Sequence, residues 1–249
     1  MIPYIEWTSF AIGPFTIYVW GLFVGLGFVL ASLVAGWFAK RQGGDAKVIY
    51  DLTFWMLVTG FVGARLGYVL FYAPMEFWKH PLEIIRVWDG GMSMFGGLAL
   101  SVAVGLWYLK RRRVDVWQYA DAAMFGLPFG LWIGRIGCFL IHDHPGTATD
   151  FVLGVEYPDG IVRHDHGLYL SINGLLMGLA FLWLSRKRRP PMFYMGAFAL
   201  WYGAVRFFLD FFRIADVKYG YLTPAQYFSI ALVVVGIWLL IKINRKKYE

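Results

Sequence analysis

The stretch GLPFGLWIGRIGCFLI, residues 126–141, holds a single charged residue, Arg135, among side chains that are otherwise apolar or small. It lies in a longer run, 117–141, which as a helix is long enough to cross about 30 Å of hydrocarbon. Six other runs have the same character, so the sequence predicts an all-α integral membrane protein with seven transmembrane helices. The predicted spans are 16–39, 48–72, 92–109, 117–141, 168–185, 193–212 and 225–243.

The composition favours the same class of protein. Of the 249 residues, 59% are hydrophobic and only 16% are charged, whereas soluble domains average about 25% charged residues. The single cysteine excludes an internal disulfide. We interpret the chain as one polytopic membrane domain over 1–249, with an external loop at about 142–167.

The basic residues indicate an orientation in the membrane. Of the 23 lysines and arginines, 15 follow the first, third, fifth and seventh spans. Cytoplasmic loops carry such an excess, so the N-terminus is predicted to lie outside and the C-terminus in the cytoplasm. Because each basic cluster adjoins an apolar span, a surface that binds nucleic acid is excluded. The clusters contain Lys40, Arg41 and Lys47, then 110–113, then 186–189, then Lys242, Arg245, Lys246 and Lys247.

Three arginines, Arg65, Arg135 and Arg206, fall in the outer part of predicted spans. Arginine is costly in hydrocarbon and usually faces the bundle interior or a water-filled cavity. Three at one depth predict a polar cavity near the outer leaflet. Since guanidinium groups bind phosphate in a bidentate geometry, we expect a phosphate-bearing lipid headgroup there. The alternative is that these arginines reach lipid phosphates at the membrane surface or form ion pairs within the bundle.

Helical spacing groups the polar residues further. Arg206 and Asp210 are four residues apart, so they share a helix face and are expected to pair. Arg135, Cys138 and His142 also fall on one face. Cys138 is either a nucleophile or a small apolar residue in a helix interface, and the second interpretation is favoured.

The segment VWDGGMSMFGG, 87–97, forms a turn at the outer end of the third span. Glycines let the backbone bend or approach a ligand closely. Asp89, Gly90, Gly91 and Gly96 are therefore expected to shape the access path to the cavity. The alternative is that the glycines only permit close packing of helices.

Four motifs together are similar to those of the prolipoprotein diacylglyceryl transferase family, over about residues 11–243 and in the same order. They are GARLGYVLFY (63–72), PLEIIRVWDGGMS (81–93) with its following FGG, GLPFGLWIGRIGCF (126–139) and YGAVRFFLDFFR (202–213). The resemblance implies a seven-span enzyme of the bacterial inner membrane. Such an enzyme moves diacylglycerol from phosphatidylglycerol to the thiol of the lipobox cysteine of lipoprotein precursors. The implied partners are phosphatidylglycerol, the signal-peptide lipobox of the precursors and membrane lipids, with no nucleic acid and no cofactor.

The resemblance also implies roles for individual residues. The arginine of the family's GRxGNF signature is matched by Arg135 and that of YGxxR by Arg206, and both are implied to bind lipid and to act in catalysis. Asp210 stands where the family has glutamate and would orient Arg206. His166 falls where the family has a histidine near the start of span five, and it is a further candidate for substrate binding. Arg65 is a weaker candidate, for positioning or for a second lipid site.

Three positions depart from the family pattern. Phe95 stands where the family has a histidine regarded as important for catalysis, Cys138 where it has asparagine, and Trp20 where it has tyrosine. The reaction implied by the resemblance needs a thiolate as nucleophile and a stabilised phosphate as leaving group. Since phenylalanine cannot accept a proton, the expected base is missing at position 95.

The loop after the fourth span contains two His-Asp-His triplets, 142–144 and 164–166. One of them is expected to supply a replacement base, with His142 the candidate nearest to Arg135. Two alternatives stay open: the four histidines bind a transition metal, or they cap helices and face solvent. Two other functions also stay open, namely transfer of a lipid group to a different acceptor and non-enzymatic binding or transport of phospholipid.

Overall fold

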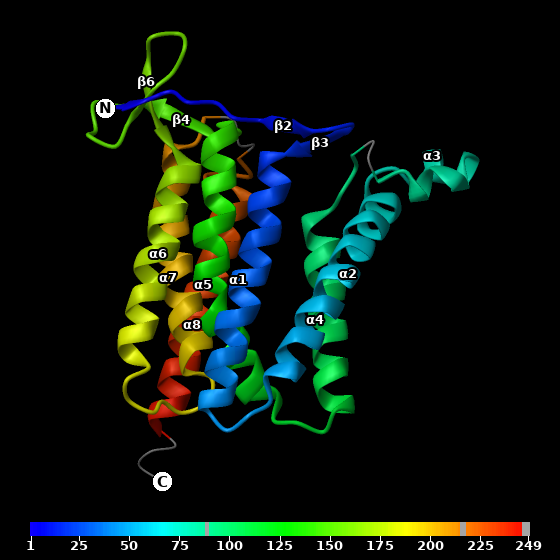
Figure 1. The fold of residues 1–249 in the computed structure, drawn as a ribbon, viewed down its shortest axis with the longest axis vertical. Coiled ribbons are helices and arrows are strands. Elements are labelled where there is room, and N and C mark those ends of the chain that lie inside the picture. Colours follow the sequence, from blue (N-terminus) through cyan, green and yellow to red (C-terminus); the bar gives the residue numbers. More distant parts are fainter. Residues whose placement is uncertain (88–89, 215–217, 246–249) are drawn as a thin grey trace.

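The structure, a computed structural model, describes residues 1–87, 90–214 and 218–245. Most of these residues form helices that run along one common axis (Figure 1). The helices are α1 (Val19–Arg41), α2 (Ala46–Phe71), α3 (Pro74–Lys79), α4 (Met94–Arg111), α5 (Val116–Ile141), α6 (His166–Leu184), α7 (Phe193–Leu209) and α8 (Pro224–Arg245), with 3₁₀ helices η1 (Pro81–Ile85) and η3 (Asp210–Phe212).

Six helical segments in the described part of the chain are long and apolar enough to cross a membrane. They are α1, α2, α5, α6, the segment Phe193–Phe212 that joins α7 to η3, and Pro224–Asn244 of α8. The third predicted span corresponds to α4, which has only 18 residues and ends in Lys110 and Arg111. These two charges lower its mean hydropathy. The prediction of a polytopic helical membrane protein is therefore confirmed for six spans.

The first predicted span begins too early. Residues 16–18 belong to strand β3 (Phe15–Tyr18), which pairs with β2 (Ser9–Ile12), and the helix begins only at Val19. The apolar run passes from strand to helix without a polar break, so hydropathy alone does not separate the two elements.

The helical bundle has the all-α architecture that the sequence predicts, and short strands are added at one end of it. The N-terminal residues and the loop after α5 form a four-stranded sheet in the order β1-β5-β6-β4, at the same end of the bundle as the β2–β3 hairpin (Figure 1). Its strands have two to four residues, too few for a recognisable alternation of polar and apolar residues. They are β1 (Ile2–Pro3), β4 (Pro145–Ala148), β5 (Val155–Glu156) and β6 (Val162–Asp165).

The central helix of the bundle is α5, which packs against α1, α6 and α7. Its Phe125 is fully buried, with the ring stacked on Phe38 at 4.0 Å and the edge of Tyr194 at 4.9 Å. This aromatic core holds α5 toward the end of the bundle opposite the strands. The polar residues of α5 at the opposite end are therefore carried on a rigid element.

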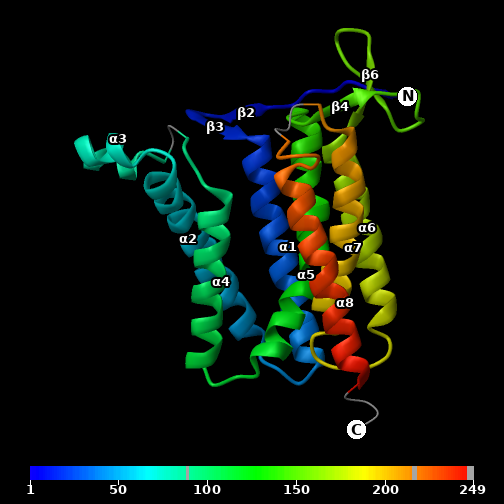
Figure 2. The ribbon, with the colours of Figure 1, turned by 180° about the vertical axis from the view of Figure 1, so that it is seen from behind.

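Helices α2 and α4 form an antiparallel pair that diverges from α1 toward the end that bears the strands. The divergence is plain in Figure 1 and in the reverse view of Figure 2. The pair packs tightly within itself, because Gly96 of α4 lies against Gly63 and Gly67 of α2. A Cβ atom on Gly96 would lie 2.4 Å from the Gly63 carbonyl oxygen. The α2–α4 pair thus behaves as one arm beside the rest of the bundle.

Asp121 on α5 caps the start of a different helix. The residue before α7, Met192, has no side-chain cap hydrogen bond, and the buried carboxylate of Asp121 accepts a hydrogen bond from the Met195 N–H at 2.8 Å. Loss of a helix N-cap costs about 1–2 kcal/mol. We expect Asp121→Ala to lower the free energy of unfolding by about that amount in a reversible unfolding experiment in detergent.

Asp121→Asn keeps an acceptor oxygen, so its free energy of unfolding should fall less than that of the alanine variant. Asp150→Ala is the matched control, because Asp150 lies exposed in the loop between β4 and β5. An Asp121→Ala protein as stable as the control would show that the cap contributes nothing.

Candidate active site

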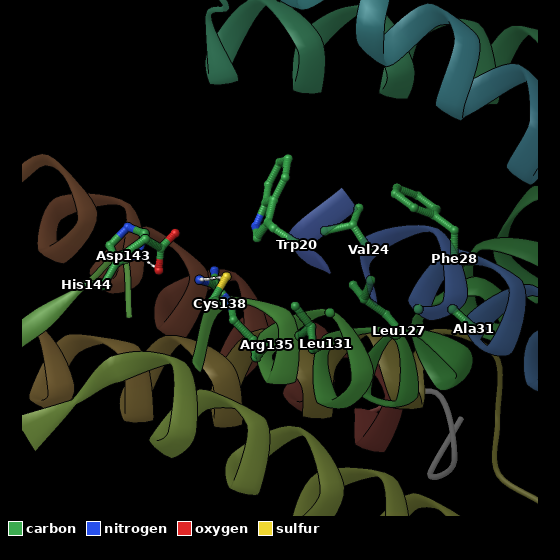
Figure 3. A pocket seen from close by; sticks show the side chains of 13 residues that line it. Trp20, Val24, Phe28, Ala31, Leu127, Leu131, Arg135, Cys138, Asp143 and His144 are labelled. Carbon is green, nitrogen blue, oxygen red and sulfur yellow. Dashed lines mark hydrogen bonds and ion pairs between the residues drawn. The ribbon is translucent and has the colours of Figure 1, made fainter. Parts of the chain in front are cut away.

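A cavity of about 420 Å³ opens beside α1 and α5, and Arg135 lies at its polar end. The remainder of the wall is mostly apolar or glycine, and comes from both helices. These residues are Trp20, Val24, Gly27, Phe28 and Ala31 of α1 and Leu127, Gly130, Leu131 and Gly134 of α5. In Figure 3 the guanidinium of Arg135 lies between these side chains and the Asp143–His144 pair. The cavity is thus amphiphilic, with one charged end and an apolar body.

Arg135 has no carboxylate partner among the residues that the structure describes. Its guanidinium donates to the Sγ atom of Cys138 at 3.8 Å, a weak acceptor. The predicted shared face of Arg135 and Cys138 is therefore present. A guanidinium in an apolar wall without a counterion is costly unless a bound anion compensates its charge.

Arg206 on α7 lies near Arg135, close enough for the two cations to interact electrostatically. It pairs with the buried carboxylate of Asp210 at 3.1 Å, as its spacing predicts, and Arg213 approaches the same carboxylate at 3.8 Å. Two arginines therefore share one carboxylate, and Arg135 lies near them without a carboxylate partner of its own among the described residues. This excess of positive charge near the cavity favours an anionic ligand.

Asp210 is fixed by a second contact from α8. The hydroxyl of Thr223 donates to the other carboxylate oxygen of Asp210. Thr223 also forms a capping box with Gln226, in which each residue's backbone N–H donates to the other's side chain, at 3.0 and 3.1 Å. The start of α8 thereby holds Asp210, which in turn orients Arg206.

His166, the first residue of α6, lies within electrostatic range of Arg206 and Arg213. Its side chain is buried against the Phe212 backbone, and neither ring nitrogen has a well-aligned hydrogen-bond partner among the described residues. The structure therefore brings His166 together with the arginines, as its predicted grouping requires.

His142 does not reach the cavity. The α5 helix ends at Ile141, and His142 adopts a left-handed conformation with φ of 48°. Its Nδ1 lies 2.8 Å from Asp165, and its ring stacks on Tyr4 and touches Phe139 and Tyr157. The prediction that His142 shares the Arg135 face is wrong, because helical spacing does not extend beyond the end of the helix.

Asp165 joins the ends of two helices. One carboxylate oxygen lies 2.8 Å from Nδ1 of His142 and accepts a hydrogen bond from the Tyr157 hydroxyl at 3.1 Å. The other oxygen caps α6, because it accepts a hydrogen bond from the Leu168 N–H at 3.0 Å. Burial, followed by the charge of Asp165, raises the pKa of the Tyr157 phenol, which stays a donor. This cluster fixes the loop above the cavity.

His164 belongs to the same loop and also lies outside the cavity wall. Its Nδ1 lies 2.8 Å from the Tyr169 hydroxyl, and its ring packs on Phe212. Burial lowers the pKa of His164 below its ordinary value. The four histidines of the two triplets therefore lie in four different environments. Among the described residues, no group of three histidine, cysteine or acidic side chains is placed to hold a metal ion.

Asp143 and His144 are the functional candidates that the sequence did not single out individually. Both line the cavity, and the Nδ1 of His144 pairs with the Asp143 carboxylate. The backbone turns at His142, and this turn directs the next two residues toward Arg135 (Figure 3). The only sequence signal was their place in the first His-Asp-His triplet.

Arg65 has a different role from the other two arginines. Its five N–H groups all donate to backbone carbonyls of the segment that precedes α4, at 2.6–3.1 Å. The acceptors are Glu83, Ile84, Arg86, Gly90 and Gly91. The guanidinium has no donor left for a phosphate, so the geometry favours the positioning role over a second lipid site.

The glycines of the turn divide into two groups. Gly90 and Gly91 have φ of 84° and 72°, a conformation that favours glycine, and their carbonyls accept from Arg65. Gly96 lies in the α2–α4 interface instead, as the close-packing alternative requires. Asp89 lies outside the described residues.

Two of the three positions that depart from the family pattern meet in the cavity. Trp20 and Cys138 both line it, beside Arg135. Phe95 does not line it; it lies on α4 and is half exposed. The departures at Trp20 and Cys138 therefore lie beside Arg135, where the headgroup of a ligand would lie.

A second groove of about 530 Å³ adjoins this cavity between α1 and α2. The two share Trp20, Val24 and Phe28, and the groove extends to Tyr50 and Phe61 of α2. Its wall is almost entirely apolar. The Arg135 cavity is thus continuous with an apolar surface on the side where the α2–α4 arm diverges.

Comparison with known proteins identifies the family. A family model described as prolipoprotein diacylglyceryl transferase matches residues 8–242. The phosphatidylglycerol–prolipoprotein diacylglyceryl transferase of Solidesulfovibrio magneticus is 37% identical over 254 residues, which cover 96% of this chain and 94% of the relative. The proteins of that name from Pseudomonas entomophila and Brucella anthropi are 36% and 30% identical, over 99% and 98% of this chain and 97% and 93% of their own lengths. With a match over nearly its whole length, the chain belongs to the prolipoprotein diacylglyceryl transferase family.

Proposed function

We propose that this protein transfers diacylglycerol from phosphatidylglycerol to the lipobox cysteine thiol of lipoprotein precursors. The names of its relatives supply the two substrates, and the cavity fits the lipid. The thiolate sulfur would attack the glycerol carbon that bears the phosphate. A C–S bond forms, the C–O bond to phosphate breaks, and glycerol phosphate leaves with the electron pair.

The observation that carries this proposal is the guanidinium of Arg135 at the polar end of a largely apolar cavity, where it forms no ion pair with a carboxylate of the described residues. A phospholipid satisfies both ends of such a cavity, since its phosphate pairs with the arginine and its acyl chains cover the apolar wall. Charge-assisted donors aimed at a departing phosphate also stabilise the transition state. Arg135 would therefore serve in binding and in catalysis.

The other polar residues have supporting roles in this proposal. Arg206 would contact the same phosphate from α7, and Asp210 would keep its guanidinium in place. His166 would face the headgroup beside Arg206. Arg65 would fix the turn at Gly90 and Gly91 that leads into α4.

We also propose seven membrane spans, with α4 crossing beside α2. The basic clusters that end α1 and α4 and follow α6 lie at the end of the bundle opposite the strands, which supports a cytoplasmic location for that end. The strands and the cavity would then face the outer side of the bacterial inner membrane.

A transferase with a different acceptor is the second candidate function. It is favoured by Trp20 and Cys138, which change the cavity wall at the position nearest to Arg135. The apolar body of the cavity would still take the lipid donor. Only the group that receives diacylglycerol would differ.

A reconstituted assay separates these functions. The purified protein is placed in vesicles that contain phosphatidylglycerol and is given a synthetic lipobox peptide with one cysteine. We expect a diacylglyceryl mass gain on the peptide and release of an equal amount of glycerol phosphate, with neither product when the cysteine is replaced by serine. Glycerol phosphate release without peptide modification would indicate another acceptor. Lipid retention without either product would indicate a binding protein.

A further inference from the structure

The cavity contains one side chain that is suited to remove a proton from the acceptor. Building on the proposed function, we propose that His144, oriented by Asp143, is the general base for the acceptor thiol. This assignment differs from the sequence prediction, which favoured His142.

The first argument is elimination among the groups that line the cavity. Its titratable residues are Arg135 and Cys138 from α5 and Asp143 and His144 from the loop. Arginine stays protonated and cannot accept a proton. The Cys138 thiol must itself lose a proton before it can act, and the carboxylate of Asp143 is engaged by His144. His144 remains as the acceptor.

The second argument is the orientation of the imidazole. The Nδ1 of His144 lies against the Asp143 carboxylate in an ion-pair contact that lacks the alignment of a hydrogen bond. A proton on Nδ1 would face that carboxylate, which would leave the lone pair of Nε2 to accept the proton of the thiol. A carboxylate in this position also stabilises the imidazolium that forms after proton transfer. The side chains of His144 and Asp143 are 34% and 29% exposed, which leaves the pair accessible from the cavity.

The third argument is that the backbone around His144 is fixed. Its carbonyl accepts from the His166 N–H at 3.4 Å, and the next residue, Pro145, pairs with Asp165 in the sheet. Gly146 forms a bridge to Arg213, beyond the end of α7. The segment is thus tied to both α6 and α7, which carry His166 and Arg206.

The other histidines of the loop are placed less well. His142 is enclosed by Tyr4, Phe139 and Tyr157 and pairs with Asp165. His164 contacts Tyr169 and Phe212. His166 is buried beside Arg206 and Arg213. None of these three histidines lines the cavity.

The proposed step is balanced in atoms and charge. The thiol proton moves to Nε2 of His144, and the thiolate forms the C–S bond as the phosphate leaves. The leaving glycerol phosphate gains one negative charge. The imidazolium then returns its proton to that phosphate or to water, which restores the neutral histidine.

The test is the pH dependence of turnover in the reconstituted assay. We expect His144→Gln to lower kcat about 100-fold at pH 7, the scale of general-base catalysis, with KM for phosphatidylglycerol within twofold of the wild-type value. The loss should shrink as the pH rises toward the ordinary thiol pKa of about 8.5, because the acceptor then ionises without help. Asp143→Asn should lower kcat less than His144→Gln does. The double variant should have the same kcat as His144→Gln, because the two residues act as a unit.

His80→Gln is the matched control, since His80 is an exposed histidine before η1 and lies outside the cavity wall. A His144→Gln enzyme within threefold of the control, a loss of equal size at every pH, or a change confined to KM would overturn the role as base. If the wild-type protein itself gives no product, the proposed function fails and the base assignment fails with it. That result is seen before any variant is made, so the two failures are distinguishable.

Discussion

Replacing Arg135 by alanine should lower kcat for diacylglyceryl transfer by about 100- to 1,000-fold, the range measured for loss of one donor to a developing anion. The guanidinium lies at the polar end of the cavity and has no carboxylate partner among the described residues. The leaving phosphate would therefore lose its main stabilising contact. The measurement is kcat and KM in phosphatidylglycerol vesicles.

The same substitution should leave the fold intact, because the one polar contact that the structure gives Arg135 is the weak one to Cys138. Arg135→Lys keeps the charge and loses the planar fork, so an intermediate loss is expected. Arg111→Ala serves as the control, since Arg111 lies at the opposite end of the bundle, over the Trp107 ring. An Arg135→Ala enzyme with the turnover of the control would refute the phosphate contact.

Replacing Asp210 by asparagine should affect both stability and activity. The carboxylate is fully buried and pairs with Arg206 and Arg213. Removing one partner of a buried ion pair costs about 3 kcal/mol or more, because the remaining charges are left uncompensated. Arg206 also loses the contact that orients it, so kcat/KM should fall even well below the unfolding temperature.

Thr223→Val provides the comparison for Asp210. It removes the hydroxyl that donates to Asp210 and leaves the carboxylate with both arginines. The loss of turnover should be smaller than for Asp210→Asn. Thr223→Ser keeps the hydroxyl and should have the turnover of the wild-type protein. Unfolding in detergent and kcat/KM are measured on the same preparations. An Asp210→Asn protein with wild-type stability and turnover would show that the ion pair does not orient Arg206.

The parts of the site that the sequence predicted lie within single helices. Arg135 and Cys138 are three residues apart, and Arg206 and Asp210 four, so local helical geometry is enough to bring each pair together. The apolar runs likewise predicted the long helices, because hydrocarbon requires about 20 apolar residues for each span.

The parts that the sequence missed depend on where a helix ends or on distant backbone. The left-handed turn at His142 sends that ring to Asp165 and brings His144 into the cavity. Helical spacing carries no information beyond such a turn. The backbone partners of Arg65 could not be predicted for the second reason, since these acceptors lie 18–26 residues away in a segment without regular spacing.

The groove between α1 and α2 also changes how the concentration of the lipid donor should be understood. Because the groove shares Trp20, Val24 and Phe28 with the Arg135 cavity, a two-chain lipid can pass from the leaflet to the arginine without entering water. Encounter then follows diffusion in two dimensions. The quantity that saturates the protein is the mole fraction of phosphatidylglycerol in the bilayer, and the volume of the surrounding solution is irrelevant to it.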